Sequence, residues 1–251
     1  MKLDFDTDDG IGTRATFGAI VLETDETLEP EFARMMALDG VALYHSRIAM
    51  VSDIRPETLG QMEADLPAAA RLLPPSLGFD VIGYGCTSAS TVIGSDRVAK
   101  AIQSVFPRAK VTDPLKAIIA ACQSLKARQV GFITPYIPQV SQRMRHKLED
   151  VGLEISCLAS FEEGDDPTVA RITPASIVRA AERVANHTPC DVIVISCTNL
   201  RCLDIIPLLE DRLNRPVISS NQALAWHMQR LARVDAPNPQ FGRLFNCDLV
   251  G

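Results

Sequence analysis

The chain lacks the features of a membrane protein, a secreted protein or a nucleic-acid-binding protein. No apolar run approaches the roughly 18 residues that cross a bilayer. Residues 1–6 (MKLDFD) are acidic and do not contain the apolar core of a secretion signal. The 25 Lys and Arg are outnumbered by 31 Asp and Glu, and the net charge of −6 argues against a basic binding surface. These absences predict a cytoplasmic protein that binds neither a membrane nor nucleic acid.

The chain also lacks the cysteine pattern of a disulfide framework or a metal site. Seven cysteines are an odd number, and 251 residues are too many for a small disulfide-stapled domain. A zinc site needs two closely spaced pairs of ligands, whereas Cys197 and Cys202 have no second pair and the four histidines are scattered. We therefore expect reduced thiols and no bound metal.

What the chain does have is a regular alternation of short apolar runs and amphipathic segments. The expected strands are 16–22, 40–45, 80–84, 110–112, 129–133, 153–158, 191–195 and 216–219. The expected helices are 29–38, 56–73, 91–106, 114–127, 137–151, 174–186, 203–212 and 221–233. Strands that alternate with helices predict a parallel α/β architecture, and continuously apolar runs indicate strands covered on both faces. Asp53 and Thr173 are expected to cap the helices that begin near Pro56 and Pro174.

One phrase occurs twice and divides the chain. Residues 79–88 (FDVIGYGCTS) and 189–199 (PCDVIVISCTN) each join an Asp-Val-Ile run to a Cys-Thr pair. Each phrase contains the third strand of a run of four, which favours two open four-stranded sheets over one closed barrel. We expect an N-terminal lobe over 1–127 and a C-terminal lobe over 128–222, with 223–251 packing back on the first lobe.

The two phrases place one thiol at the end of each third strand. Ligands of open α/β sheets bind beyond the carboxyl ends of the strands, where Cys86 and Cys197 both fall. A helix start behind each cysteine would lower the pKa of the thiol and offer backbone amides to a substrate carboxylate. The alternative is that both cysteines only fill core space. Further hydrogen-bonding groups beside the thiols are Thr87, Ser88, Thr198 and Asn199.

Two more strand ends are expected to border the same cleft. The strand 16–22 runs into a loop that contains Thr24 and Asp25, and the strand 129–133 runs toward Tyr136. The Tyr136 hydroxyl can hydrogen-bond a substrate or position a thiol. Alternatively, Tyr136 only covers the core, as tyrosines at strand ends often do.

These motifs resemble the aspartate/glutamate racemase superfamily, in its branch of maleate cis-trans isomerases and arylmalonate decarboxylases. The matching segments are 84–88 (YGCTS), 134–136 (TPY), 196–201 (SCTNLR) and 216–227 (PVISSNQALAWH). The resemblance covers nearly the whole chain. It implies two pseudo-symmetric α/β lobes, an active site between them, and no metal or organic cofactor. It is also compatible with a homodimer.

The resemblance further implies a role for each thiol. In the isomerases the first cysteine is a nucleophile that adds to an alkene carbon and the second is a proton donor, so these roles pass to Cys86 and Cys197. The tyrosine of the Thr-Pro-Tyr motif corresponds to Tyr136. The decarboxylases carry glycine at the first cysteine position, so Cys86 disfavours decarboxylation.

The chain departs from the isomerases at two positions where they carry a substrate-binding asparagine. Their Pro-Ser-Ser-Asn after the first strand is replaced by 22–25 (LETD), and the nearest match to the second asparagine is Asp166. A carboxylate about 4 Å from a dicarboxylate repels it by roughly 1 kcal/mol in water, and by more in a dry cleft. Asp25 and Asp166 therefore suit a substrate with an ammonium or amide group, as expected for superfamily members found with ectoine degradation. Alternatively, Asp25 only caps the following helix.

We therefore predict a cofactor-independent isomerase of a small carboxylic acid that uses two cysteines and is similar to maleate cis-trans isomerase. The first alternative is a two-thiol racemase of an amino acid or of an acylated diamino acid linked to ectoine degradation. The second is a non-catalytic protein that binds a small molecule on the same fold. A thiol redox protein ranks last because the chain has no Cys-x-x-Cys motif.

Overall fold

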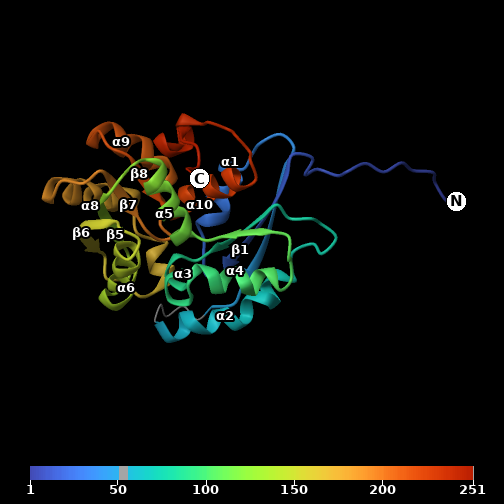
Figure 1. Cartoon of the computed structure of the whole chain (residues 1–251), viewed down its shortest axis with the longest axis horizontal. Helices are drawn as coiled ribbons and strands as arrows, with labels where there is room; N and C mark the ends of the chain where they lie inside the picture. The colour runs from blue at the N-terminus through green and yellow to red at the C-terminus, as the bar shows by residue number, and fades with distance from the viewer. Residues whose placement is uncertain (51–55, 251) are drawn as a thin grey trace.

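The strands form two separate parallel sheets with the same topology (Figure 1). This computed structural model describes residues 1–50 and 56–250, without the side chains of 56–60, so the expected cap Asp53 lies outside the described residues. Within that part of the chain, the first sheet has the order β2-β1-β3-β4 and the second has the order β6-β5-β7-β8. The second sheet thus repeats the strand order of the first. The predicted fold class of two four-stranded α/β lobes is confirmed.

The strands lie close to their predicted ranges. The first sheet contains Ala15–Leu22 (β1), Val41–Ile48 (β2), Val81–Gly85 (β3) and Lys110–Thr112 (β4). The second contains Gln129–Thr134 (β5), Glu154–Ser160 (β6), Val192–Ile195 (β7) and Val217–Ser219 (β8). Strands β1, β3 and β7 are buried along their whole length, whereas the edge strands β2 and β6 are partly exposed. Complete burial of the central strands is what helices on both faces of a parallel sheet produce.

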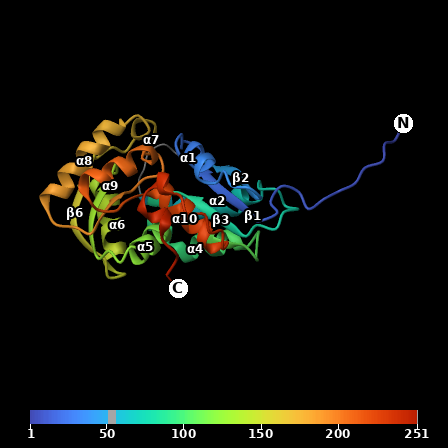
Figure 2. The ribbon, with the colours of Figure 1, turned by 90° about the horizontal axis from the view of Figure 1, so that it is seen from above.

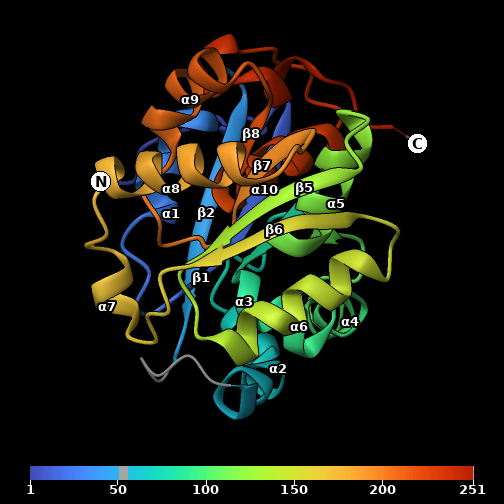
Figure 3. The same ribbon diagram turned by 90° about the vertical axis from the view of Figure 1, so that its left-hand side faces the viewer.

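Helices cover both faces of each sheet. In the N-terminal half they are Leu28–Met35 (α1), Pro56–Ala70 (α2), Thr87–Ile93 (α3), Ser95–Gln103 (α4) and Pro114–Ser124 (α5). In the C-terminal half they are Pro138–Glu149 (α6), Asp166–Val169 (α7), Pro174–His187 (α8), Ile206–Leu213 (α9) and Ser220–Leu231 (α10). Figure 1 shows α2, α3 and α4 on one side of the first sheet and α1 and α10 on the other, and Figure 3 shows α6 and α8 beside β5 and β6. In the described part of the chain, no helix is both long enough and apolar enough to span a bilayer.

One predicted helix is wrong in a way that affects the site. The sequence predicts a single helix over 91–106, but the structure has α3 and α4, separated at Gly94. Gly94 has φ = 93°, a backbone conformation that glycine reaches without the steric penalty of a Cβ atom. The break lets α3 begin directly behind Cys86. The predicted cap Thr173 is confirmed, because its Oγ1 accepts a hydrogen bond from Ser176 N at 3.2 Å.

The last helix crosses from the second sheet to the first. A capping box between Ser219 and Gln222 starts α10 directly after β8. The helix then packs against β3 and β4 of the first sheet and against α5 (Figure 2). A Cβ atom at Gly83 would lie 2.6 Å from Met228 Sδ, so the glycine permits the close approach of α10 to β3. Trp226 is fully buried on this helix. The segment after β8 therefore joins the two sheets into one core.

Candidate active site

Cys86 lies between the end of strand β3 and the start of helix α3. Cys86 is the N-cap of α3, and its Sγ accepts a hydrogen bond from Ala89 N at 3.3 Å. The Sγ atom also lies 3.5 Å from Ser88 Oγ. The side chain is nearly inaccessible, because the residue is 1% exposed. The local environment of this thiol thus follows the sequence prediction of a helix start after the strand.

Cys197 lies between the end of strand β7 and a turn. The residue is 3% exposed, and its Sγ accepts a hydrogen bond from Asn199 N at 3.4 Å. The next helical segment begins only at Leu203. The prediction of a helix start behind both cysteines is therefore wrong for Cys197. At this position the chain forms a turn whose residues contact the other lobe.

Burial raises the pKa of both thiols. For Cys86 the loss of solvent raises the pKa to about 11, although hydrogen bonds from Ser88 and Ala89 act in the opposite direction. For Cys197 burial, followed by the charge of Asp166, raises the pKa well above the usual value. The sequence argument predicted a lowered pKa from the backbone amides, and the structure contradicts it because desolvation outweighs those hydrogen bonds. Both thiols are therefore protonated at neutral pH in this structure.

Two loops from different lobes bring carboxylates to the thiols. Asp25 follows β1, and Asp166 opens α7; both side chains are buried. The lobes meet here, because Thr24 Oγ1 donates to Asp166 Oδ2 at 2.5 Å. Both charges raise the pKa of Cys86 and of Cys197, which places both carboxylates within electrostatic reach of both sulfur atoms. Burial in turn raises the pKa of each carboxyl group.

The two oxygens of Asp25 have different surroundings. Oδ1 accepts hydrogen bonds from Thr27 N at 2.8 Å and from Leu28 N at 2.7 Å, so Asp25 does cap the start of α1. Oδ2 is buried and forms no hydrogen bond of good geometry, although the Thr198 side chain lies near enough to lower the pKa of Asp25. A buried carboxylate oxygen without a partner is costly, and a donor supplied by a ligand would satisfy it.

Tyr136 lies with the two thiols. It follows β5 and is fully buried, which raises the pKa of its hydroxyl well above the usual value. Burial is the largest cause of this raised pKa. The next two causes are the negative charges that Cys197 and Cys86 would carry as thiolates. The Tyr136 side chain lies close enough to Cys197 to lower the pKa of that thiol, against the larger effect of burial. The structure thus places Tyr136 beside the thiols, and its contact with a substrate stays a prediction.

The Asn199 amide hydrogen-bonds two loops, the one after β1 and the one at the start of α7. Its Oδ1 accepts a hydrogen bond from Glu26 N at 2.9 Å. Its Nδ2 donates to Asp166 O at 3.2 Å and to Thr24 O at 3.4 Å. The sequence analysis assigned Asn199 to substrate binding, but in this structure its acceptor and both of its donors are engaged with the protein.

Two of the predicted hydroxyls also form contacts between the lobes. Thr87 Oγ1, at the start of α3, donates to Ser220 Oγ at 2.9 Å. Thr198 Oγ1 donates to Gly85 O at 3.4 Å, directly before Cys86. These residues lie at the predicted cleft, where they hold the two strand ends together.

Two functional candidates escaped the sequence analysis. Glu31 on α1 is buried and accepts a hydrogen bond from Asn221 Nδ2 at 2.8 Å. Glu31 was missed because a glutamate in an amphipathic helix usually lies on its solvent face. Asn221 belongs to the matching segment 216–227, which could have drawn attention to it.

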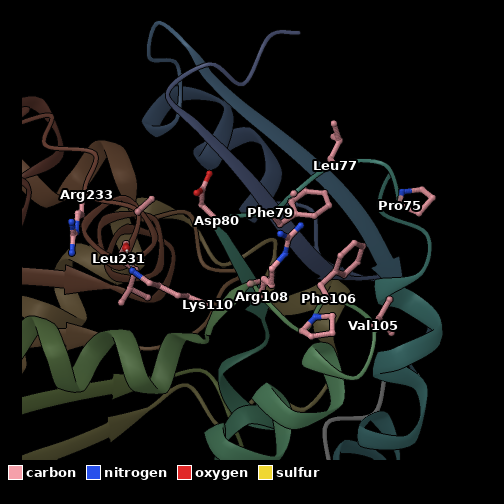
Figure 4. Close-up of a pocket in the computed structure, with 14 residues that line it drawn as sticks. Pro75, Leu77, Phe79, Asp80, Val105, Phe106, Arg108, Lys110, Leu231 and Arg233 are labelled. Atoms are coloured by element: carbon pink, nitrogen blue, oxygen red, sulfur yellow. Dashed lines mark hydrogen bonds between the residues drawn. The ribbon is translucent and has the colours of Figure 1, made fainter. Parts of the chain in front are cut away.

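The thiols do not line the cavity shown in Figure 4. This cavity of about 560 Å³ lies at the N-terminal ends of β3 and β4, opposite the strand ends that carry the cysteines. Two of its polar groups serve the fold, since Asp80 Oδ2 accepts a hydrogen bond from Thr16 N at 2.8 Å and Lys110 Nζ donates to Leu231 O at 2.7 Å. We therefore place the candidate site at the cysteines.

The residue types of the site are thiols, carboxylates and hydroxyls. All seven cysteines are free. Among residues 1–50 and 56–250, no group of three or more His, Cys, Asp or Glu is arranged to hold a metal ion. The chemistry that these groups can perform is proton transfer and the formation of a carbon–sulfur bond.

Two lobes of one topology, each with a cysteine just beyond its third strand, define a pseudo-symmetric two-thiol α/β protein. The sequence profile of the arylmalonate decarboxylase family matches residues 26–245, so the chain belongs to this family. The maleate isomerase of Nocardia farcinica is 26% identical over 241 residues, 92% of this chain and 95% of that protein. The arylmalonate decarboxylase of Bordetella bronchiseptica is 34% identical over 132 residues, 52% of this chain and 55% of that protein.

A solved structure has the same fold. It is a cysteine-to-serine mutant of the Nocardia farcinica maleate cis-trans isomerase with a covalently bound succinylcysteine intermediate. It is 23% identical to this chain, covers 92% of this chain and 98% of its own, and superposes with a TM-score of 0.83. The resemblance that the sequence motifs indicated is confirmed.

Proposed function

We propose that this protein is a cofactor-independent isomerase of a small carboxylic acid, in which Cys86 and Cys197 act on one substrate. One observation carries the proposal. Thr198 Oγ1, next to Cys197, donates to Gly85 O, next to Cys86, at 3.4 Å, so the segments that carry the two cysteines meet although they belong to different lobes. The similarity to the Nocardia farcinica maleate isomerase over 92% of the chain supports the reaction class.

In a cis-trans isomerisation, the Cys86 sulfur adds to one alkene carbon and Cys197 delivers a proton to the other. The new carbon–carbon single bond rotates, Cys197 removes the proton again, and the carbon–sulfur bond breaks to release the isomer. Because the pKa of Cys86 is about 11, its thiol first has to transfer its proton to an acceptor. Asp25 and Asp166, whose pKa values burial raises, are carboxylates within electrostatic reach of it.

The second candidate function is a racemase, and the Asp25 carboxylate favours it. Its Oδ2 atom is buried and forms no hydrogen bond of good geometry within the protein, and an ammonium or amide group on the substrate would donate to it. An amino acid, or an acylated diamino acid of the kind formed in ectoine degradation, carries such a group. In this reaction one thiolate removes the α-proton while the other thiol delivers a proton to the opposite face, so configuration inverts without an adduct.

The two reactions are distinguished by a substrate screen in D2O with maleate, aspartate, glutamate and acylated diaminobutyrates. Deuterium at the α-carbon supports racemisation, whereas a substrate adduct on the Cys86 peptide in mass spectrometry supports cis-trans isomerisation. Cys86→Ser is expected to abolish either signal, whereas Cys197→Ser is expected to abolish the deuterium signal and the release of isomer. Cys157→Ser, which replaces a half-buried thiol on β6, is expected to retain them. Unchanged ligand affinity in both serine variants without any turnover would instead support a binding protein.

A further inference from the structure

Glu31, on α1 of the first lobe, forms hydrogen bonds with the segment that follows Cys197. Its Oε1 accepts hydrogen bonds from Cys202 N at 3.0 Å and Leu203 N at 2.9 Å. Its Oε2 accepts from Asn221 Nδ2 at 2.8 Å. All three donors belong to the C-terminal half of the chain, whereas Glu31 lies on α1.

Further hydrogen bonds connect Asn221 and the start of α1 to the turn that contains Cys197. Asn221 Nδ2 also donates to Thr198 O at 2.8 Å, one residue beyond Cys197. At the start of α1, Thr27 Oγ1 donates to Asn199 O at 3.1 Å. Asn199 N in turn donates to Cys197 Sγ. Two successive carbonyl groups of the turn are therefore tied to α1, one directly and one through Asn221.

We propose that Glu31 is a positioning residue whose carboxylate fastens the Cys197 turn to the first lobe. Three N–H donors converge on its two oxygens, so an acceptor is required on both. In Glu31→Gln, one of the two oxygens is replaced by an NH2 group, which cannot accept a hydrogen bond. Because Asn221 is the only one of the three donors that belongs to a side chain, we expect the bond to Asn221 to be the one that is lost. The proposal goes beyond the two-thiol reaction, because it makes the position of one thiol depend on a helix of the opposite lobe.

Glu31 lies among other charged groups. Burial raises its pKa to about 7, and the nearby charge of Asp25 acts in the same direction. Arg34 on the same helix interacts with Glu31 but is paired with Asp204 at 2.8 Å. The pKa of Cys202 is raised mainly by burial and secondly by the charge of Glu31. Replacing the carboxylate therefore changes hydrogen bonding and removes a buried charge together.

The test measures the position of the turn without any substrate. Wild type, Glu31→Gln and Glu210→Gln are treated with iodoacetamide at pH 8, and the rates at Cys197 and Cys86 are followed by peptide mass spectrometry. Glu210 is the matched control, since this buried carboxylate accepts hydrogen bonds from the backbone N–H groups of Val217 (3.1 Å) and Arg243 (2.8 Å), away from the thiols. In Glu31→Gln the ratio of the Cys197 rate to the Cys86 rate is expected to rise about tenfold, the factor that one lost buried hydrogen bond adds to local opening. In Glu210→Gln the ratio is expected to stay at the wild-type value.

A Glu31→Gln variant that folds and keeps the wild-type ratio would overturn the proposal. Should that variant fail to fold, Asn221→Ala decides, because it removes only the link between Glu31 and Thr198. Its ratio is expected to rise severalfold, and an unchanged ratio in a folded Asn221→Ala protein also overturns the proposal. Since alkylation does not require turnover, a failure of the proposed isomerase activity leaves this result interpretable.

Discussion

Replacing Asn199 with alanine removes three hydrogen bonds between the turn after Cys197 and the loops that carry Asp25 and Asp166. The bonds join the side chain to Glu26 N at 2.9 Å, Asp166 O at 3.2 Å and Thr24 O at 3.4 Å. A buried neutral hydrogen bond contributes about 1 kcal/mol net, and the two longer bonds here count for less. We therefore expect Asn199→Ala to lower the free energy of unfolding by about 2 kcal/mol.

The assay is urea unfolding at pH 7, with a matched control in which the same substitution removes no contact between the lobes. Asn186→Ala serves this purpose, because Asn186 is exposed on α8, and its effect is expected to stay within about 0.5 kcal/mol. Asn199→Asp keeps the acceptor for Glu26 N but loses both donors and places a charge near Asp166. It is therefore expected to be at least as destabilising as Asn199→Ala.

The opposite outcome would refute the assignment of the Asn199 amide to the fold. In that case Asn199→Ala would unfold at the same urea concentration as Asn186→Ala. At the same time, KM for a substrate found in the D2O screen would rise tenfold or more. Such a pair of results would mean that the amide is available to the substrate, as the sequence analysis predicted.

Three further predictions follow from burial and charge. Asp25→Asn is expected to speed the alkylation of both thiols at pH 8, because removing the negative charge lowers the pKa of Cys86 and Cys197; slower alkylation would contradict this. Gly83→Ala is expected to cost about 1–3 kcal/mol in urea unfolding, since its Cβ would meet Met228, whereas Gly78→Ala, with no atom within 4 Å of its Cβ, is expected to be nearly neutral. Glu31 has its pKa raised from 4.5 to about 7, so its stabilising contribution is complete below about pH 4.5 and is lost as the pH rises through about 7. The loss is on the order of 3 kcal/mol between pH 4.5 and 8, and Glu31→Gln is expected to reduce this slope; an equal slope in the two proteins would show that other groups cause it.

The sequence by itself determined the strands that lead to the two thiols and the helix start after Cys86. Apolar runs of strand length followed by polar turns located β3 and β7, and their repetition indicated two lobes of equal topology. These features depend on residues that are neighbours in the chain, so they can be read from spacing and residue type. The break at Gly94 was missed because the segment 91–106 keeps a helical pattern on both sides of a single glycine.

Only the tertiary structure decided the chemical state and the partners of the site. The local argument for a helix start behind Cys86 was right, yet the pKa of the thiol rises because loops from both lobes exclude water from it. The same distant contacts engage the Asn199 amide and bury Glu31 against the segment that follows Cys197. Desolvation and Coulomb interactions depend on which segments lie within a few ångströms in space, and the spacing of residues along the chain does not encode that arrangement.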